Sequence, residues 1–137
     1  MTQIQSLSAP LGRVLIAAMF LIAGFQKISG YAGTAGYMEA MGVSGALLPL
    51  VILLEIGGAL AVIAGWQTRI VAALLAGFTV LSALIFHADF GDQMQTILFL
   101  KNLAIAGGFL FLVANGPGAY ALDTRAAGTR PGTVPAR

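Results

Sequence analysis

Four apolar segments, each close to the length that crosses a bilayer, constrain this chain more than any other feature. They cover residues 11–28, 47–66, 69–88 and 95–114. A helix rises about 1.5 Å per residue, so about 20 apolar residues cross roughly 30 Å of hydrocarbon. Only 9% of the residues are charged, against about 25% in soluble domains. The sequence therefore predicts an all-α membrane protein, a four-transmembrane-helix bundle within residues 1–123.

The connections between these segments have recognisable sequences. Residues 35–41 form either a short helix at the membrane interface or a plain loop, and both interpretations remain open. Tight turns are predicted at residues 66–69 and 89–92, and Gly116-Pro117-Gly118 is expected to end the last helix. Residues 124–137, rich in Gly, Pro, Thr and Ala, are expected to form a disordered cytoplasmic tail.

The basic residues predict the orientation of the bundle. Cytoplasmic flanks hold the excess of Lys and Arg, and five arginines fall at the end shared by both termini and the second connection: Arg13, Arg69, Arg125, Arg130 and Arg137. Both termini are therefore predicted to be cytoplasmic. The first segment is expected to stay attached and not to be cleaved as a signal peptide.

The residues that are absent exclude several kinds of chemistry. The chain has no cysteine and one histidine, so thiolate sites and iron–sulfur clusters are excluded and a zinc or bis-histidine haem site is not expected. The basic residues are dispersed, and nucleic acid is not an expected partner. No metal and no covalently bound cofactor is predicted.

Glu55 and Lys101 each lie inside an apolar segment. A charge there costs roughly 2.5 to 3.5 kcal/mol on insertion scales, so each needs a partner or a cavity. Counted from the outer helix ends, Glu55 lies roughly 12 Å below Leu47 and Lys101 roughly 10 Å below Met94. The sequence therefore predicts that Glu55 and Lys101 form a buried pair.

Two interpretations of this pair remain open. It either binds or protonates a small molecule in a pocket of the bundle, or only determines which helix faces which. Lys27, His87 and Asn102 are the candidates for the mouth of the pocket. Each also has an alternative interpretation. Lys27 could extend its ammonium to the membrane interface, His87 could be a solvated or capping residue at a helix end, and Asn102 could bond to a neighbouring helix.

The order of these features resembles the DoxX family of small bacterial inner-membrane proteins. The resemblance runs from about Leu11 to Asp123, and its motifs are Gly12-Arg13, Gly24-Phe25-Gln26-Lys27, Tyr37-Met38, Glu55 with Gly57-Gly58, Thr68-Arg69, Lys101-Asn102, Gly116-Pro117-Gly118 and Leu122-Asp123. It implies a four-helix bundle in the inner membrane, with relatives in thiosulfate:quinone oxidoreduction and in oxidative or quinone stress. Lys27, Glu55, Lys101 and Asn102 stand at the polar intramembrane positions of the family.

Three functional hypotheses follow. The first is a redox-accessory subunit that binds a quinone or similar lipophilic molecule near Glu55 and Lys101, and that receives electrons from a partner oxidoreductase subunit or a soluble enzyme. The second is a small-solute transporter or pore, for which a homo-oligomer would be needed. The third is a membrane scaffold for a partner enzyme. The sequence does not decide whether the protein is an enzyme.

Overall fold

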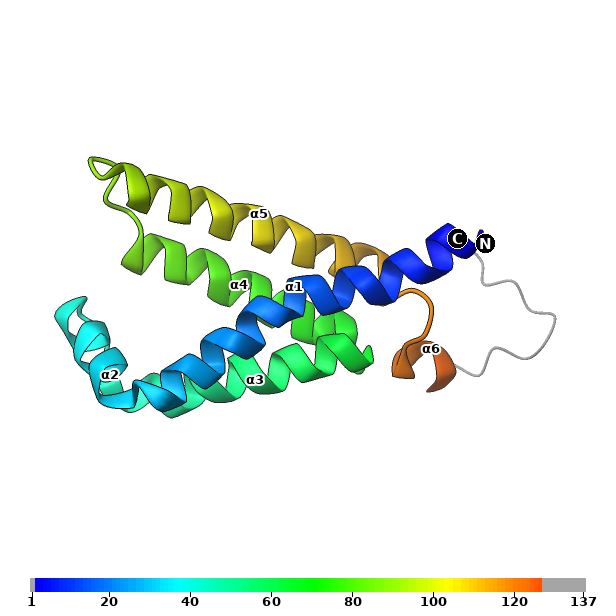
Figure 1. Ribbon diagram of the computed structural model, residues 1–137, viewed down its shortest axis with the longest axis horizontal. Helices are drawn as coiled ribbons and strands as arrows, with labels where there is room; N and C mark the ends of the chain where they lie inside the picture. Colours follow the sequence, from blue (N-terminus) through cyan, green and yellow to red (C-terminus); the bar gives the residue numbers. More distant parts are fainter. Residues whose placement is uncertain (1, 127–137) are drawn as a thin grey trace.

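The computed structural model describes residues 2–126, and helices dominate it. In chain order the elements are α1 (Gln3–Ser29), α2 (Tyr31–Ala40), the 3-10 turn η1 (Gly45–Leu47), α3 (Leu48–Ala64), α4 (Thr68–Phe86), α5 (Gln93–Asn115) and α6 (Leu122–Ala126). Four helical segments are long and apolar enough to cross a membrane: α1, η1 with α3, α4 and α5. The prediction of four transmembrane helices is confirmed (Figure 1).

The helix ends follow the local sequence. The first helix begins at Gln3, earlier than the expected residue 11, because Thr2 and Gln5 form a reciprocal cap in which each side chain accepts from the other residue's backbone N–H. The last long helix ends at Asn115, where Gly116 has a φ of 74°. Residues 31–40 form the short helix α2 and not a loop, which settles that alternative.

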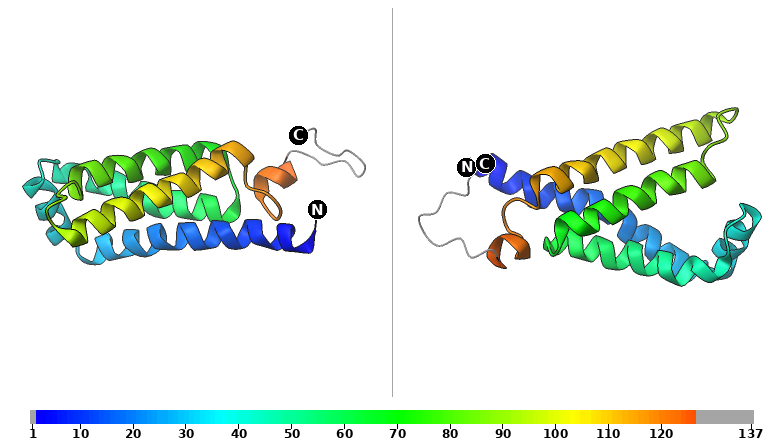
Figure 2. Two further views of the ribbon diagram at one scale, coloured as in Figure 1. Left: turned by 90° about the horizontal axis from the view of Figure 1, so that it is seen from above. Right: turned by 180° about the vertical axis from the view of Figure 1, so that it is seen from behind.

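The four long helices are arranged as two closely packed pairs. α1 packs along α3 and α4 along α5, while the contact between α3 and α4 is smaller. Figure 1 and the right-hand view of Figure 2 show α3 and α4 joined at their shared turn and diverging toward the end that carries α2. The protein is therefore a bundle that is closed at one end and splayed at the other.

Small residues determine where the helices approach closely. A Cβ on Gly24 of α1 would collide with Ile56 of α3, and a Cβ on Gly58 of α3 would lie 3.2 Å from Leu75 of α4. α1 reaches α5 through the rings of Phe20 and Phe109, whose centroids are 5.4 Å apart. Close backbone approach at glycine is typical of membrane bundles, where packing replaces the hydrophobic effect between helices.

Arg13 and Asp123 hold the closed end together. The Arg13 side chain is 1% exposed and donates to the carbonyls of Ile63, Ala119 and Tyr120 at 2.8–2.9 Å. We expected Arg13 to be a flanking charge, and instead it joins α1, the end of α3 and the chain before α6. The Asp123 carboxylate accepts from the backbone N–H groups of Gln67 and Thr68, at 2.7 and 2.8 Å, at the start of α4.

Asp123 is held in its ionised form by this arrangement. Partial burial alone would raise the pKa of its carboxyl, but the hydrogen bonds from Thr68 and Gln67 and the charge of Arg13 outweigh burial and hold the pKa below its ordinary value.

α6 remains helical through Ala126, so the first three residues of the predicted tail, 124–126, are not disordered. The remainder of that prediction lies outside the described residues.

The start of α1, the α3–α4 turn and α6 lie at one end of the molecule (Figure 1). This agrees with the prediction that both termini and the second connection share one end of the bundle. The cytoplasmic location of that end stays a prediction.

Candidate functional site

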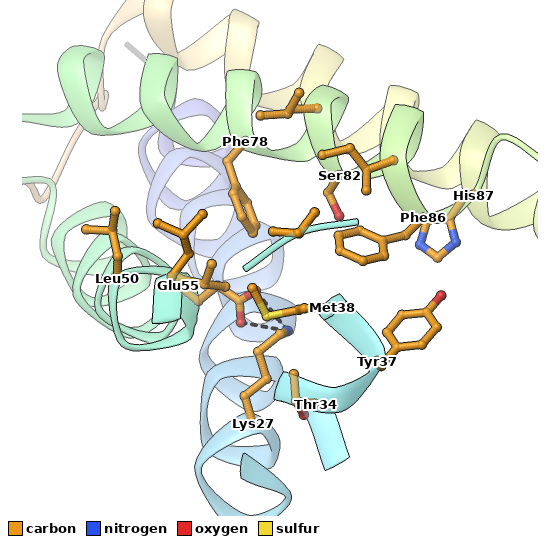
Figure 3. Close-up of a pocket in the computed structure, with 15 residues that line it drawn as sticks. Lys27, Thr34, Tyr37, Met38, Leu50, Glu55, Phe78, Ser82, Phe86 and His87 are labelled. Atoms are coloured by element: carbon orange, nitrogen blue, oxygen red, sulfur yellow. Dashed lines mark hydrogen bonds and ion pairs between the residues drawn. The ribbon is translucent and has the colours of Figure 1, made fainter. Parts of the chain in front are cut away.

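A cavity of about 340 Å³ lies at the splayed end, between α2, α3 and α4 and beside the last turn of α1. Its wall is mostly apolar, and its polar groups come from six residues: Lys27, Thr34, Tyr37, Glu55, Ser82 and, at the rim, His87. Figure 3 shows Phe78, Ser82 and Phe86 projecting from α4 toward Glu55 and Lys27 on the other side. The size falls within the range of small-molecule sites, about 300 to 1,000 Å³.

An ion pair forms the polar part of this cavity. The Lys27 Nζ lies 2.9 Å from one Glu55 carboxylate oxygen and 3.0 Å from the other. The Glu55 side chain is 4% exposed and that of Lys27 27% exposed. Gly24, one turn before Lys27, allows α1 to lie against α3 at Glu55 and Ile56, so the lysine reaches the carboxylate from the neighbouring helix.

The predicted pair of Glu55 with Lys101 is wrong, because Lys27 occupies that position. Lys101 lies on an exposed face of α5, and α5 packs mainly on α4. Helix direction explains the exchange. Side chains tilt toward the N-terminus of their helix, so Lys27 near the end of α1 tilts back into the membrane. Lys101 tilts toward the splayed end, where α5 begins.

The other two sequence candidates have different positions. His87 lines the cavity, and its Nδ1 lies 2.7 Å from Oε1 of Gln95 at the start of α5. Asn102 does not line the cavity; its side chain donates to the backbone carbonyl of Thr79 at 3.2 Å. Asn102 therefore bonds to the neighbouring helix, which was the alternative interpretation of that residue.

Sequence reasoning missed the contribution of α2 and α4 to the cavity. The rings of Tyr37 on α2 and Phe86 on α4 stack with centroids 5.4 Å apart, and Met38 is 5% exposed. Phe78, Ser82 and Phe86 follow each other at intervals of four residues and so share one helix face. A polar serine among aromatics at this spacing was the signal for a cavity-facing stripe.

Comparison with known proteins agrees with this architecture. The family model described as DoxX matches residues 9–88. The protein belongs to the DoxX family. This DoxX chain is 50% identical over 123 residues to the inner membrane protein YqjF of Escherichia coli strain K12, an alignment that covers 90% of this chain and 95% of the relative. It is 36% identical over 122 residues to the inner membrane protein YphA of the same organism, covering 84% and 87% of the two chains.

No solved structure matches the chain. Together, the relatives and the four membrane-spanning helices show that this DoxX protein is a multi-pass protein of the bacterial inner membrane. Within it, Lys27 and Glu55 form a charged pair in a mostly apolar cavity. An ammonium donates hydrogen bonds to a carbonyl, and a carboxylate accepts a proton or a hydroxyl hydrogen bond.

Proposed function

We propose that the protein binds a quinone, or a chemically similar lipophilic carbonyl compound, in the cavity between α2, α3 and α4. The observation that supports this proposal best is the ion pair of Lys27 and Glu55 in an apolar cavity. The two charges cancel, so the cavity suits a ligand without net charge. Lys27 donates to a ring carbonyl, and Glu55 takes up or releases the proton that accompanies reduction.

The proposed role is that of an accessory component of a membrane oxidoreductase. The chain has no cysteine with which to carry electrons itself, so a partner subunit or a soluble enzyme supplies them. The protein then contributes the binding of the lipophilic molecule and the handling of its protons. This assignment gives Lys27 the place beside Glu55 that the sequence analysis gave to Lys101.

The test is mass spectrometry of the lipids that copurify with the protein in mild detergent. We expect a quinone with the wild type, and its loss in Lys27→Met and in Glu55→Gln. Lys101→Met is the matched control, because it removes the same charge from a membrane helix outside the cavity. Equal quinone content in wild type, Lys27→Met and Glu55→Gln, or no quinone in any of them, would reject the proposal.

A further inference from the structure

We infer that the cavity opens sideways into the bilayer, between Leu50 of α3 and Leu81 of α4, and that its ligand is a lipid-borne molecule with an uncharged polar ring and a long apolar tail. This inference rests on the proposed function and adds the class of ligand and its route of entry. The opening between these two leucines is called the lateral opening below.

Leu50 and Leu81 face the cavity and the outside of the bundle at the same time. Both line the cavity, yet Leu50 is 62% and Leu81 56% exposed. Each belongs to a row of exposed leucines on its helix, with Leu53 on α3 and Leu84 on α4. In a membrane these rows contact lipid, so the cavity is continuous with the hydrocarbon at this point.

The depth of the lateral opening agrees with entry from lipid. Leu81 lies five residues before Phe86, roughly 8 Å from the end of α4, and Glu55 lies seven residues after Leu48, roughly 10 Å into α3. A ring bound at Glu55 therefore lies below the headgroups. Its tail can leave between Leu50 and Leu81 without crossing the interface.

The route toward water is more obstructed than the lateral one. α2 lies over this end of the molecule (Figure 1), with Met38 buried and Tyr37 stacked on Phe86. His87, at the rim, contacts Gln95. A molecule arriving from water has to separate these contacts, whereas one arriving from lipid meets only leucine side chains.

The chemistry of the cavity selects the two parts of the ligand. Lys27 and Glu55 offer hydrogen bonds without net charge, which favours a ring with carbonyl or hydroxyl groups over an anion or a cation. The leucines at the lateral opening favour a saturated or polyprenyl tail. A water-soluble solute has no apolar tail with which to contact those leucines.

The test uses the full chain in lipid nanodiscs and two probes: 2,3-dimethoxy-5-methyl-benzoquinone without a tail, and the same ring with a decyl tail. We expect Leu81→Trp to weaken binding of the tailed probe about tenfold or more, because an added ring overfills the opening, and to leave the tail-free probe unchanged. Leu84→Trp is the matched control, since Leu84 is equally exposed on the same helix and does not line the cavity.

The results of this experiment distinguish failure of the lateral opening from failure of the proposed function. If Leu81→Trp affects both probes equally or affects neither, while the wild type binds the tail-free ring, the lateral opening is rejected and the proposed function stands. If the wild type binds neither probe, both proposals fail. If Leu81→Trp does not fold, Leu50→Trp tests the other side of the opening, and binding of the tail-free ring confirms that the variant is intact.

Discussion

Lys27 and Glu55 are bonded across two helices, with the ammonium 2.9 and 3.0 Å from the two carboxylate oxygens. Removing one member leaves the other charge in an apolar environment, whereas removing both does not. We therefore expect Lys27→Met to lower the free energy of unfolding in detergent by about 3–5 kcal/mol if Glu55 stays ionised. The melting temperature should fall accordingly. The double variant Lys27→Met with Glu55→Leu should recover much of that loss.

Lys101→Met provides the comparison for this cycle. Lys101 is exposed on α5, so its replacement should change the unfolding temperature little. A double variant no more stable than Lys27→Met, or a Lys101→Met variant as unstable as Lys27→Met, would contradict the assigned pair.

Arg13 should tolerate no replacement, not even by lysine. Its two terminal nitrogens serve the end of α3 and the carbonyls of Ala119 and Tyr120 at once, and a lysine has one nitrogen on a flexible stem. Each buried carbonyl left without a donor costs about 1–3 kcal/mol. We expect a large fall in the melting temperature of Arg13→Lys and almost none in Arg125→Lys, an exposed site on α6. Equal melting temperatures would contradict this role of Arg13.

Gly65 is expected to be the glycine least tolerant of alanine. It ends α3 with φ 72° and ψ 37°, a left-handed conformation that disfavours a side chain, and an added Cβ would lie 2.9 Å from the Ala121 Cα. Gly65→Ala should therefore reduce the folded fraction measured by size-exclusion chromatography. Gly77→Ala, with nothing within 4 Å of its added Cβ, should fold as well as the wild type. Normal yield and stability of Gly65→Ala would show that α3 and α6 can separate without cost.

Asp123 predicts a loss of stability in acid. Its pKa in the folded protein lies below the ordinary 3.8, so the carboxylate contributes stability above that pH, and the contribution disappears as the pH falls through the lower folded value. The melting temperature of wild type should exceed that of Asp123→Asn near neutral pH, and the difference should shrink as the pH falls below 3.8. A difference that is independent of pH would mean that ionisation of Asp123 does not stabilise the closed end.

The cytoplasmic location of the closed end has a direct test. The chain has no cysteine, so single cysteines at Gln67 and Asp89 report on the two ends of α4. We expect a membrane-impermeant maleimide added to intact spheroplasts to label Asp89→Cys and not Gln67→Cys, and both after lysis. The reverse labelling pattern would mean that the protein has the opposite orientation in the membrane.

The transmembrane helices were predictable because the length and apolar character of a span are properties of the local sequence. The pairing of helices was not. By residue count Glu55 and Lys101 are at similar distances along their spans, but such a count says nothing about which helices are adjacent. Contacts such as Gly24 with Ile56 determine which helices touch, and a glycine does not indicate its partner.

The candidate site shows the same division between local and long-range information. Glu55 was identified because a charge within an apolar span needs a reason, and the structure gives it a partner. Lys27 was expected either at the mouth of the pocket or snorkelling to the interface, because it lies near the end of its span. The depth that it reaches depends on the direction in which the helix runs and on the fold of α2, neither of which a span-by-span count includes.

The connection of the two helix pairs at one end has a mechanical consequence. Among residues 2–126, the hydrogen bonds from Arg13 to the carbonyls of Ala119 and Tyr120 join α1 to the chain after α5 at the closed end. At the splayed end, side-chain hydrogen bonds stay within each pair, as between Lys27 and Glu55 and between His87 and Gln95. A small change in the angle between the α1–α3 pair and the α4–α5 pair alters the width of the cavity without breaking a polar contact. If the proposed function is correct, this freedom lets the cavity accept rings of different size.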